Sequence, residues 1–260
     1  MNGELPLYYS RLAPFRAVFE QGNPILTYHK LGPRPRRARL KGLYLSQALF
    51  ARQLKELRAE GFASGTLTAC AGPRAGKQIV FTFDDGYANI LRHGLEPLAA
   101  TNFRAVQFLV AGLLGKCNEW DVPQGETPEP MMDAAQVRDW LAAGHDIGSH
   151  TLTHPCLTRL PLPQAREEIA ASRKQLEDLF GRPIAHFCYP YGDWNEPVRD
   201  LVVEAGYRTA CTTEAGVNTA ADSPFALKRF TARYPSRKLK TLWLWMRERW
   251  RSPEAKDLNA

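Results

Sequence analysis

The feature that most constrains this chain is an apolar run that stops abruptly at two acidic residues. Residues 79–83 are apolar, β-branched or aromatic, with Thr82 the one polar member, and Asp84, Asp85 and Gly86 follow directly. Such a run is typical of a strand buried on both faces of a mostly parallel sheet. Neighbouring side chains on a strand point to opposite faces, so Asp84 and Asp85 can have different roles, one at a cation and one as a base. A strand followed by an ordinary Asp-Gly turn explains the same residues equally well.

Strand-like and helix-like patterns alternate through most of the chain. This alternation predicts βα units that build a right-handed parallel sheet or barrel, in which loops at the strand ends carry the chemistry. We find no internal repeat and no clear linker, and therefore expect one main domain after a peripheral lead-in at residues 1–22. The expected strands are 23–30, 79–83, 104–110, 184–189 and 207–213, and the expected helices are one between Ser46 and Gly61 and others at 89–100, 133–143, 163–180 and 196–205.

The composition favours anionic partners and a cytoplasmic location. The net charge is +7 and the isoelectric point is about 9.2, so nucleic acid, anionic lipid and phosphorylated substrates are all compatible with the charge. No run of about 18 apolar residues predicts a membrane span, and residues 1–20 lack the pattern of a signal peptide. The five cysteines include no CxxC pair, which favours reduced thiols over disulfides or a structural zinc site.

Two basic segments each permit two interpretations. Residues 32–42 are rich in proline and arginine and predict an exposed loop, which is either simply solvated or in contact with a phosphate or lipid headgroup. Residues 236–250 combine five basic side chains with three tryptophans. As a helix, this segment suits an anionic membrane surface, and it equally suits a terminal helix packed against the domain.

Three residues form a candidate metal site. His150 and His154 are four positions apart, a spacing that lets two imidazoles face one point from a helical turn or a tight loop. With Asp85 they would supply two nitrogens and a carboxylate, and would leave an open position for water as catalytic zinc requires. Such a site polarises a carbonyl and generates hydroxide near neutral pH. Two histidines at this spacing are a weak signal alone, and the Asp-Asp pair at a strand end strengthens it.

Three motifs in this order resemble those of the polysaccharide deacetylases, the NodB-homology group of carbohydrate esterases. They are Thr-Phe-Asp-Asp-Gly at 82–86, His-Thr-Leu-Thr-His at 150–154 and Tyr-Pro-Tyr-Gly at 189–192. The resemblance covers roughly residues 23–235 and leaves 236–260 as a basic, Trp-rich segment. It implies a distorted (β/α) barrel with about seven parallel strands and metal-dependent removal of acyl groups from sugars. It further implies Asp84 as general base, Asp85, His150 and His154 as metal ligands, and the backbone N–H of Tyr191 as a stabiliser of the oxyanion.

The chain departs from the family pattern at two positions. Cys188 stands where the third motif usually carries an arginine that orients the base, and Arg229 is the candidate replacement. The late histidine that serves as general acid is missing, because no histidine follows His186. The segment Tyr28-His29 resembles the opening strand of biofilm-type poly-N-acetylglucosamine deacetylases, which implies His29 as the acid. The candidate substrate-binding residues are Asp193, Trp194, Asn195 and Arg229.

These observations lead to a functional hypothesis with two alternatives. We expect a hydrolase that uses Zn²⁺ to remove an N-acyl group from an amino sugar, on a lipid-linked or envelope glycan precursor. We expect it in the cytoplasm or peripherally at the inner, anionic face of the membrane, without nucleic acid as a partner. The alternatives are a deacetylase of a polymeric glycan, such as chitin or poly-N-acetylglucosamine, and a non-catalytic glycan-binding protein.

Overall fold

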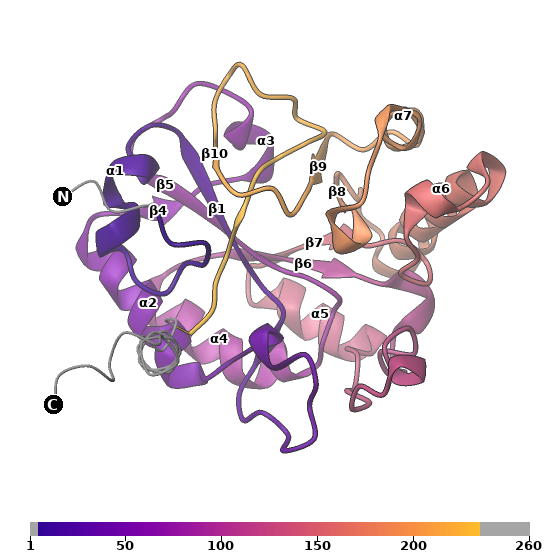
Figure 1. Cartoon of the computed structure of the whole chain (residues 1–260), viewed down its shortest axis with the longest axis horizontal. Coiled ribbons are helices and arrows are strands. Elements are labelled where there is room, and N and C mark those ends of the chain that lie inside the picture. Colours follow the sequence, from indigo (N-terminus) through magenta and orange to yellow (C-terminus); the bar gives the residue numbers. More distant parts are fainter. Residues whose placement is uncertain (1–4, 235–260) are drawn as a thin grey trace, which may run out of the picture.

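The computed structural model describes residues 5–234 as one α/β body (Figure 1). The principal strands are β1 (Asn23–Tyr28), β5 (Gln78–Phe83), β6 (Ala105–Leu109), β7 (Asp146–Ser149), β8 (His186–Cys188) and β9 (Thr209–Cys211), with shorter strands β2 (Lys30–Leu31), β3 (Tyr44–Leu45), β4 (Ala63–Ser64), β10 (Val217–Asn218) and β11 (Phe230–Thr231). The helices are α1 (Arg16–Phe19), α2 (Gln47–Ala59), α3 (Leu67–Cys70), α4 (Asn89–Thr101), α5 (Ala134–Ala142), α6 (Leu162–Phe180) and α7 (Glu196–Glu204).

The sheet curls back on itself and is almost entirely parallel. Strands β1, β5, β6, β7, β8 and β9 pair in that order, all parallel. A parallel bridge joins Cys211 at the end of β9 to Leu227, and β11 a few residues later pairs parallel with β1. The segment 227–231 thereby connects the two edges of the sheet. These six strands and β11 form the curled, mostly parallel sheet, with the short strand β4 parallel beside β5 and β10 antiparallel beside β1. This arrangement confirms the distorted barrel expected from the resemblance.

Helices cover the outside of the curled sheet (Figure 1), and the five predicted helices begin within one residue of their expected starts, while α1 and α3 were not predicted. The Ser46 side chain accepts the N–H of Leu49 at the start of α2. Asp133 forms a capping box with Gln136 at the start of α5. Both caps satisfy backbone donors that a helix end otherwise leaves free. Strands β8 and β9 are shorter than predicted, and after β8 the chain turns directly into the loop that carries the third motif.

The N-terminal segment is part of the core, which differs from the peripheral lead-in that the sequence suggested. Tyr9, Phe15 and Phe19 are fully buried, and their rings contact one another and Phe230 of β11. The backbone of Tyr9 also bonds to Thr231 and Arg233 on either side of Ala232. Sequence reasoning missed this because the aromatic residues are dispersed among charged ones and show no clear period.

Residues 236–260 lie outside the described part of the chain, so the predicted basic helix at 236–250 is not among the described elements. Within residues 5–234, no helix is both long enough and apolar enough to cross a bilayer.

The buried N-terminal cluster predicts a measurable loss of stability on truncation of one ring. Phe19→Ala removes a fully buried phenyl group and should lower the free energy of unfolding by about 3–5 kcal/mol, measured by urea denaturation. Leu7→Ala is the control, because Leu7 is 70% exposed and should change stability by less than about 0.5 kcal/mol. If both substitutions change the free energy of unfolding by the same small amount, the N-terminal segment is not part of the core.

Candidate metal centre and active site

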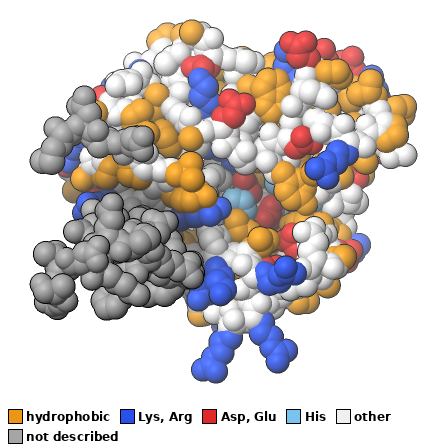
Figure 2. All heavy atoms as spheres, viewed as in Figure 1, with side chains coloured by type: hydrophobic (Ala, Val, Ile, Leu, Met, Phe, Trp, Pro, Cys, Tyr) orange, Lys and Arg blue, Asp and Glu red, His pale blue; other side chains and the backbone are white. Residues whose placement is uncertain are grey.

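The predicted site residues meet where the parallel strands end. Asp84 and Asp85 follow β5, His29 follows β1, and His150 follows β7. Strands β1 and β5 end level with each other, since Tyr28 is in register with Phe83 and its carbonyl accepts the N–H of Asp84 at 2.9 Å. Figure 2 shows histidine and carboxylate atoms at the floor of a depression in the middle of one face.

Asp85, His150 and His154 form a compact set of metal donors. Oδ1 of Asp85 is 3.4 Å from Nε2 of His150 and 3.4 Å from Nε2 of His154. All three side chains are buried, and their donor atoms lie within 4.8 Å of one another. Burial by itself would raise the pKa of the Asp85 carboxyl, but its interactions with the two neighbouring histidines outweigh burial and hold that pKa well below its usual range.

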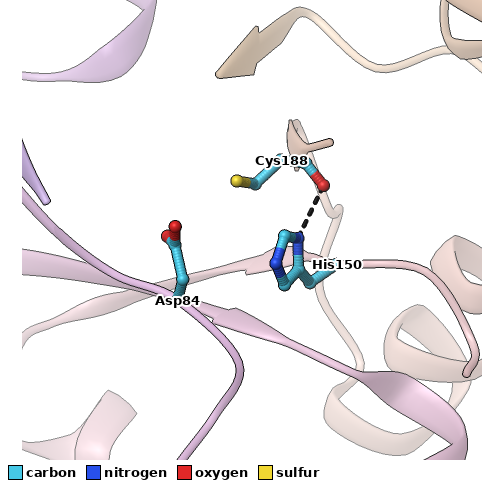
Figure 3. Close-up of side chains that lie close together, drawn as sticks. All are labelled: Asp84, His150 and Cys188. Atoms are coloured by element: carbon cyan, nitrogen blue, oxygen red, sulfur yellow. Dashed lines mark hydrogen bonds between the residues drawn. The ribbon is translucent and has the colours of Figure 1, made fainter. Parts of the chain in front are cut away.

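The surroundings of the two histidines fit a role as zinc ligands. Nδ1 of His150 donates to the carbonyl oxygen of Cys188 at 2.6 Å (Figure 3). This bond fixes the tautomer and leaves Nε2 unprotonated, 3.4 Å from Oδ1 of Asp85. Such an outer hydrogen bond is the usual way in which a metal-binding histidine is oriented. The His154 ring stacks on Trp120 with centroids 4.3 Å apart. Two imidazole nitrogens and one carboxylate oxygen form the type of donor set that catalytic zinc sites use.

A second group of metal-type side chains shares His150 but is a weaker candidate. Asp84, His150 and Cys188 also have donor atoms within 4.8 Å of one another, and Figure 3 shows them side by side. The guanidinium of Arg229, however, contacts both Asp84 and the sulfur of Cys188, the latter at 3.2 Å. A permanent positive charge at this place repels a cation, so the group that contains Asp85 is the better metal site.

Arg229 holds Asp84 in a bidentate ion pair at the base of the site. Nη1 donates to Oδ1 at 2.7 Å and Nη2 to Oδ2 at 2.8 Å, and both residues are almost fully buried. Burial by itself would raise the pKa of Asp84, but the charges of Arg229 and His29 and the hydrogen bonds from Arg229 lower it below its ordinary value. Asp84 is therefore an ionised carboxylate fixed in one orientation.

His29 and Tyr191 flank this carboxylate and the metal donors. Nε2 of His29 is 3.9 Å from Oδ2 of Asp84, and the His29 side chain is 21% exposed. Burial lowers the pKa of His29, while the charges of Asp85 and Asp84 oppose that change. The rings of Tyr191 and His154 pack edge to face, with their centroids 4.7 Å apart. The histidine is thus accessible from the depression and in reach of the same reacting groups.

Most of the predicted substrate-binding side chains are engaged elsewhere. Arg229 is 1% exposed and lies behind Asp84. The prediction that Arg229 contacts the substrate is therefore wrong, and its position is that of the alternative role, a partner of the base Asp84. Both oxygens of Asp193 accept hydrogen bonds from Thr158. Asn195 caps helix α7 by accepting the N–H of Val198. Trp194 stacks on Tyr189 with centroids 6.1 Å apart and remains partly exposed, so its role at a sugar stays a prediction.

Backbone strain concentrates at the motifs. Five described residues other than glycine have positive φ, and four belong to the motifs, namely Asp85, Thr151, His154 and Tyr191, while Asn102 ends helix α4 in the ordinary way. Such conformations are costly and persist mainly where function requires them. Gly192, beside Tyr191, also has φ +71°, and a Cβ there would lie 2.0 Å from Oγ1 of Thr213.

Two residues that support the site were not predicted from the sequence. Glu168 on α6 accepts the N–H groups of Leu152 and Thr153 and the hydroxyl of Thr153, which anchors the turn between the two histidines. Trp120 comes from the irregular segment between β6 and α5 and covers His154. The sequence offered one indication of Trp120, which is its position as a single tryptophan in a long loop. It offered no indication of Glu168, because a glutamate on a helix surface is common.

The pair between Asp84 and Arg229 predicts a large stability effect. Arg229→Met leaves a buried carboxylate without its partner and should lower the free energy of unfolding by about 3–5 kcal/mol, measured by urea denaturation at neutral pH. Adding Asp84→Asn to this variant should recover part of the loss. The exposed pair of Arg166 with Glu204 is the control, where Arg166→Met should cost less than about 1 kcal/mol. A loss at Arg229 no larger than at Arg166 would contradict the pairing.

Comparison with known proteins agrees with this geometry. Residues 71–210, more than half of the chain, match the family model described as polysaccharide deacetylase. YxkH of Bacillus subtilis, named as a candidate polysaccharide deacetylase, is 28% identical over 213 residues, which are 79% of this chain and 70% of YxkH. A chitooligosaccharide deacetylase of Azorhizobium caulinodans is 36% identical over 66 residues, which are 25% of this chain and 31% of that protein.

The fold is likewise shared with a solved structure. The deacetylase PplD of Streptococcus pyogenes, in complex with acetate, superposes with a TM-score of 0.71 at 21% identity, over 85% of this chain and 96% of PplD. At this identity the likeness establishes the fold alone. The family match, together with the three motifs at the ends of β5, β7 and β8, shows that the chain belongs to the polysaccharide deacetylases, hydrolases that act on the carbon–nitrogen bond of N-acylated sugars.

Proposed function

We propose that the protein removes an N-acyl group, such as acetyl, from an amino sugar, with Asp85, His150 and His154 holding a zinc ion. The observation that carries this proposal is the arrangement of Asp84. This carboxylate is paired with Arg229, lies next to the three metal donors, and faces His29 at 3.9 Å. One carboxylate that holds a cation and another fixed beside it as a base are the two groups that hydrolysis of an amide requires.

A zinc ion at this site supplies Lewis acidity, which polarises the substrate carbonyl and makes water more acidic. The chain's own residues perform the proton transfers. Asp84 is ionised, and Arg229 prevents it from rotating, so it can accept a proton from the attacking water. The backbone N–H of Tyr191 would donate to the oxygen that becomes negative as the carbonyl carbon turns tetrahedral.

His29 completes the proton balance. The C–N bond breaks only if the departing nitrogen gains a proton, because an amide anion is a poor leaving group. A protonated His29 can supply this proton, and its imidazole is the ordinary choice for proton transfer near neutral pH. The proton taken up by Asp84 then returns to His29 across the 3.9 Å between them. The reaction consumes one water and releases a carboxylic acid and a free amine.

One experiment separates metal binding from proton transfer. His150→Ala and His154→Ala should lose zinc in elemental analysis and lose activity, with His93→Ala on α4 as the control that keeps both. Asp84→Asn should keep zinc and lose about 10²–10⁴-fold in kcat. His29→Ala should keep zinc and lose activity on an N-acetyl sugar much more than on an activated acetyl ester, whose leaving group needs no proton. Full zinc content in both histidine variants, or normal kcat for Asp84→Asn, would refute the assignment.

The substrate we propose is an amino sugar joined to a lipid phosphate at the inner face of a membrane. The exposed arginines Arg34, Arg36 and Arg37 support this class. They belong to the loop that follows β2, which begins directly after His29, and Figure 2 shows basic side chains along the lower rim of the depression. A polymeric glycan is the rival substrate, in line with the name of the Azorhizobium relative. The intact set of Asp84, Asp85, His150 and His154 argues against a non-catalytic binder.

Substrate class is tested by kinetics on matched substrates. Replacement of Arg36 and Arg37 by glutamate should raise KM about tenfold or more for an N-acetyl amino sugar on a lipid phosphate in anionic vesicles, because surface charges near a membrane each contribute about 1 kcal/mol. The same variant should retain its KM for a neutral chitooligosaccharide. Arg166→Glu on α6 is the control for charge. If only the chitooligosaccharide is turned over by the unaltered protein, the polymeric substrate replaces the lipid-linked one.

A further inference from the structure

Lys30 is a buried lysine that the reaction does not use. It follows His29 directly, its side chain is 0% exposed, and its Nζ has no hydrogen-bond partner in the part of the chain that the structure describes. A buried polar atom without a partner is rare in folded proteins, and a buried charge is costly unless it is compensated. Its position next to the active site therefore requires an explanation.

Two tyrosine rings enclose the ammonium group. Nζ of Lys30 lies 4.4 Å from the ring centre of Tyr87 and 4.9 Å from that of Tyr44. Both distances are within the range of a cation–π contact. Tyr87 stands two residues after Asp85 on the same strand end, and Tyr44 belongs to β3, which pairs with the strand of Lys30. The two rings thus hold the ammonium next to the strand end that carries the metal donors.

Four carboxylates act on this enclosed ammonium through their charges. Asp85 comes from the metal site, while Asp121, Glu126 and Glu129 come from the irregular segment between β6 and α5. Asp121 is 7% and Glu126 is 5% exposed, and the hydroxyl of Tyr44 donates to Glu129. Burial lowers the pKa of Lys30, and these four carboxylates oppose that change, with Asp85 first among them. Within the described residues, Lys30 forms no direct salt bridge with any of them.

Asp121 follows Trp120, whose ring stacks on the metal donor His154, and its charge acts on both Lys30 and Asp85. Burial and the charge of Asp85 raise the pKa of Asp121, while the hydrogen bond from Asn118 and the charges of Lys30 and His154 lower it. Two buried carboxylates, Asp85 and Asp121, therefore repel each other beside the metal site. A positive charge from Lys30 reduces this repulsion and makes the surroundings of the donors less negative.

We propose that Lys30 is a positioning residue that acts through Asp85 and sets, by its charge, how tightly a divalent cation binds at Asp85, His150 and His154. This inference rests on the metal site of the proposed function. The ammonium offsets the charge of Asp121 and weakens the attraction of the acidic surroundings for a cation. With less negative charge around Asp85, the three donors would bind a divalent cation less tightly than they would without the ammonium.

The test measures cation affinity rather than activity. Zinc affinity of the purified full-length chain is determined by calorimetric competition with a chelator, together with the melting temperature. Lys30→Met removes the charge but keeps an apolar chain between the tyrosine rings, and it should bind zinc about tenfold tighter or more. Asp121→Asn should bind zinc several-fold more weakly. The double variant should return to within about threefold of the original affinity, since the two charges act on one site with opposite signs.

Two further variants distinguish charge from packing. Lys30→Arg keeps the charge and should bind zinc as the unaltered protein does. Lys174→Met on α6 removes an equal charge from an exposed ion pair with Asp178 and should change nothing. The inference is overturned if Lys30→Met binds zinc with unchanged or lower affinity. It is also overturned if Asp121→Asn binds zinc with unchanged affinity. If Lys30→Met does not fold, the affinity of Asp121→Asn decides. An unaltered protein that binds no zinc overturns the metal site and this inference together.

Discussion

The buried ion pair between Asp84 and Arg229 is the interaction on which the rest of the site depends. Besides its two bonds to Asp84, the guanidinium donates to the carbonyl of Thr212 and the hydroxyl of Thr82. It therefore joins β5, which lies beside β1, to the end of β9 at the opposite edge of the sheet and to the segment that leads into β11. A buried charge must keep its partner, so the closure of the sheet and the orientation of the base depend on the same contact.

Arg229 also explains how the chain tolerates its departure from the family motif. The third motif has Cys188 where the resemblance leads one to expect an arginine. Cysteine is small and leaves space beside Asp84, and the Arg229 side chain fills it, with Nη2 3.2 Å from the Cys188 sulfur. The positive charge beside the base is kept in space, although it comes from the segment that leads into β11. Judged by the motif alone, the arginine beside the base is lost, whereas the side-chain packing shows that Arg229 replaces it.

The parts of the site that could be predicted are those set by strand order. Asp84, Asp85 and His150 follow buried strands, and parallel strands bring their ends together whatever their separation in sequence. Contacts that depend on side-chain packing could not be predicted in this way. Sequence reasoning left Arg229 between two roles, gave no role to Glu168, and treated the N-terminal segment as peripheral although Phe15 and Phe19 pack against β11. A periodic pattern identifies elements, but it does not say which side chains meet.

The wall of the site near Lys30 shows why irregular segments can still be rigid. The loop after β2 is basic and the segment between β6 and α5 is acidic, and they are joined by Glu126, whose buried carboxylate accepts the backbone N–H groups of Arg39, Leu40 and Thr127. A carboxylate that accepts several backbone N–H groups stays ionised, and hydrogen bonds to the charged form lower the pKa of Glu126 against the effect of burial. Because Glu126 uses backbone donors, it leaves the side chains of Arg34, Arg36 and Arg37 exposed to solvent. The same contact thus fixes the loop and keeps its positive charge available.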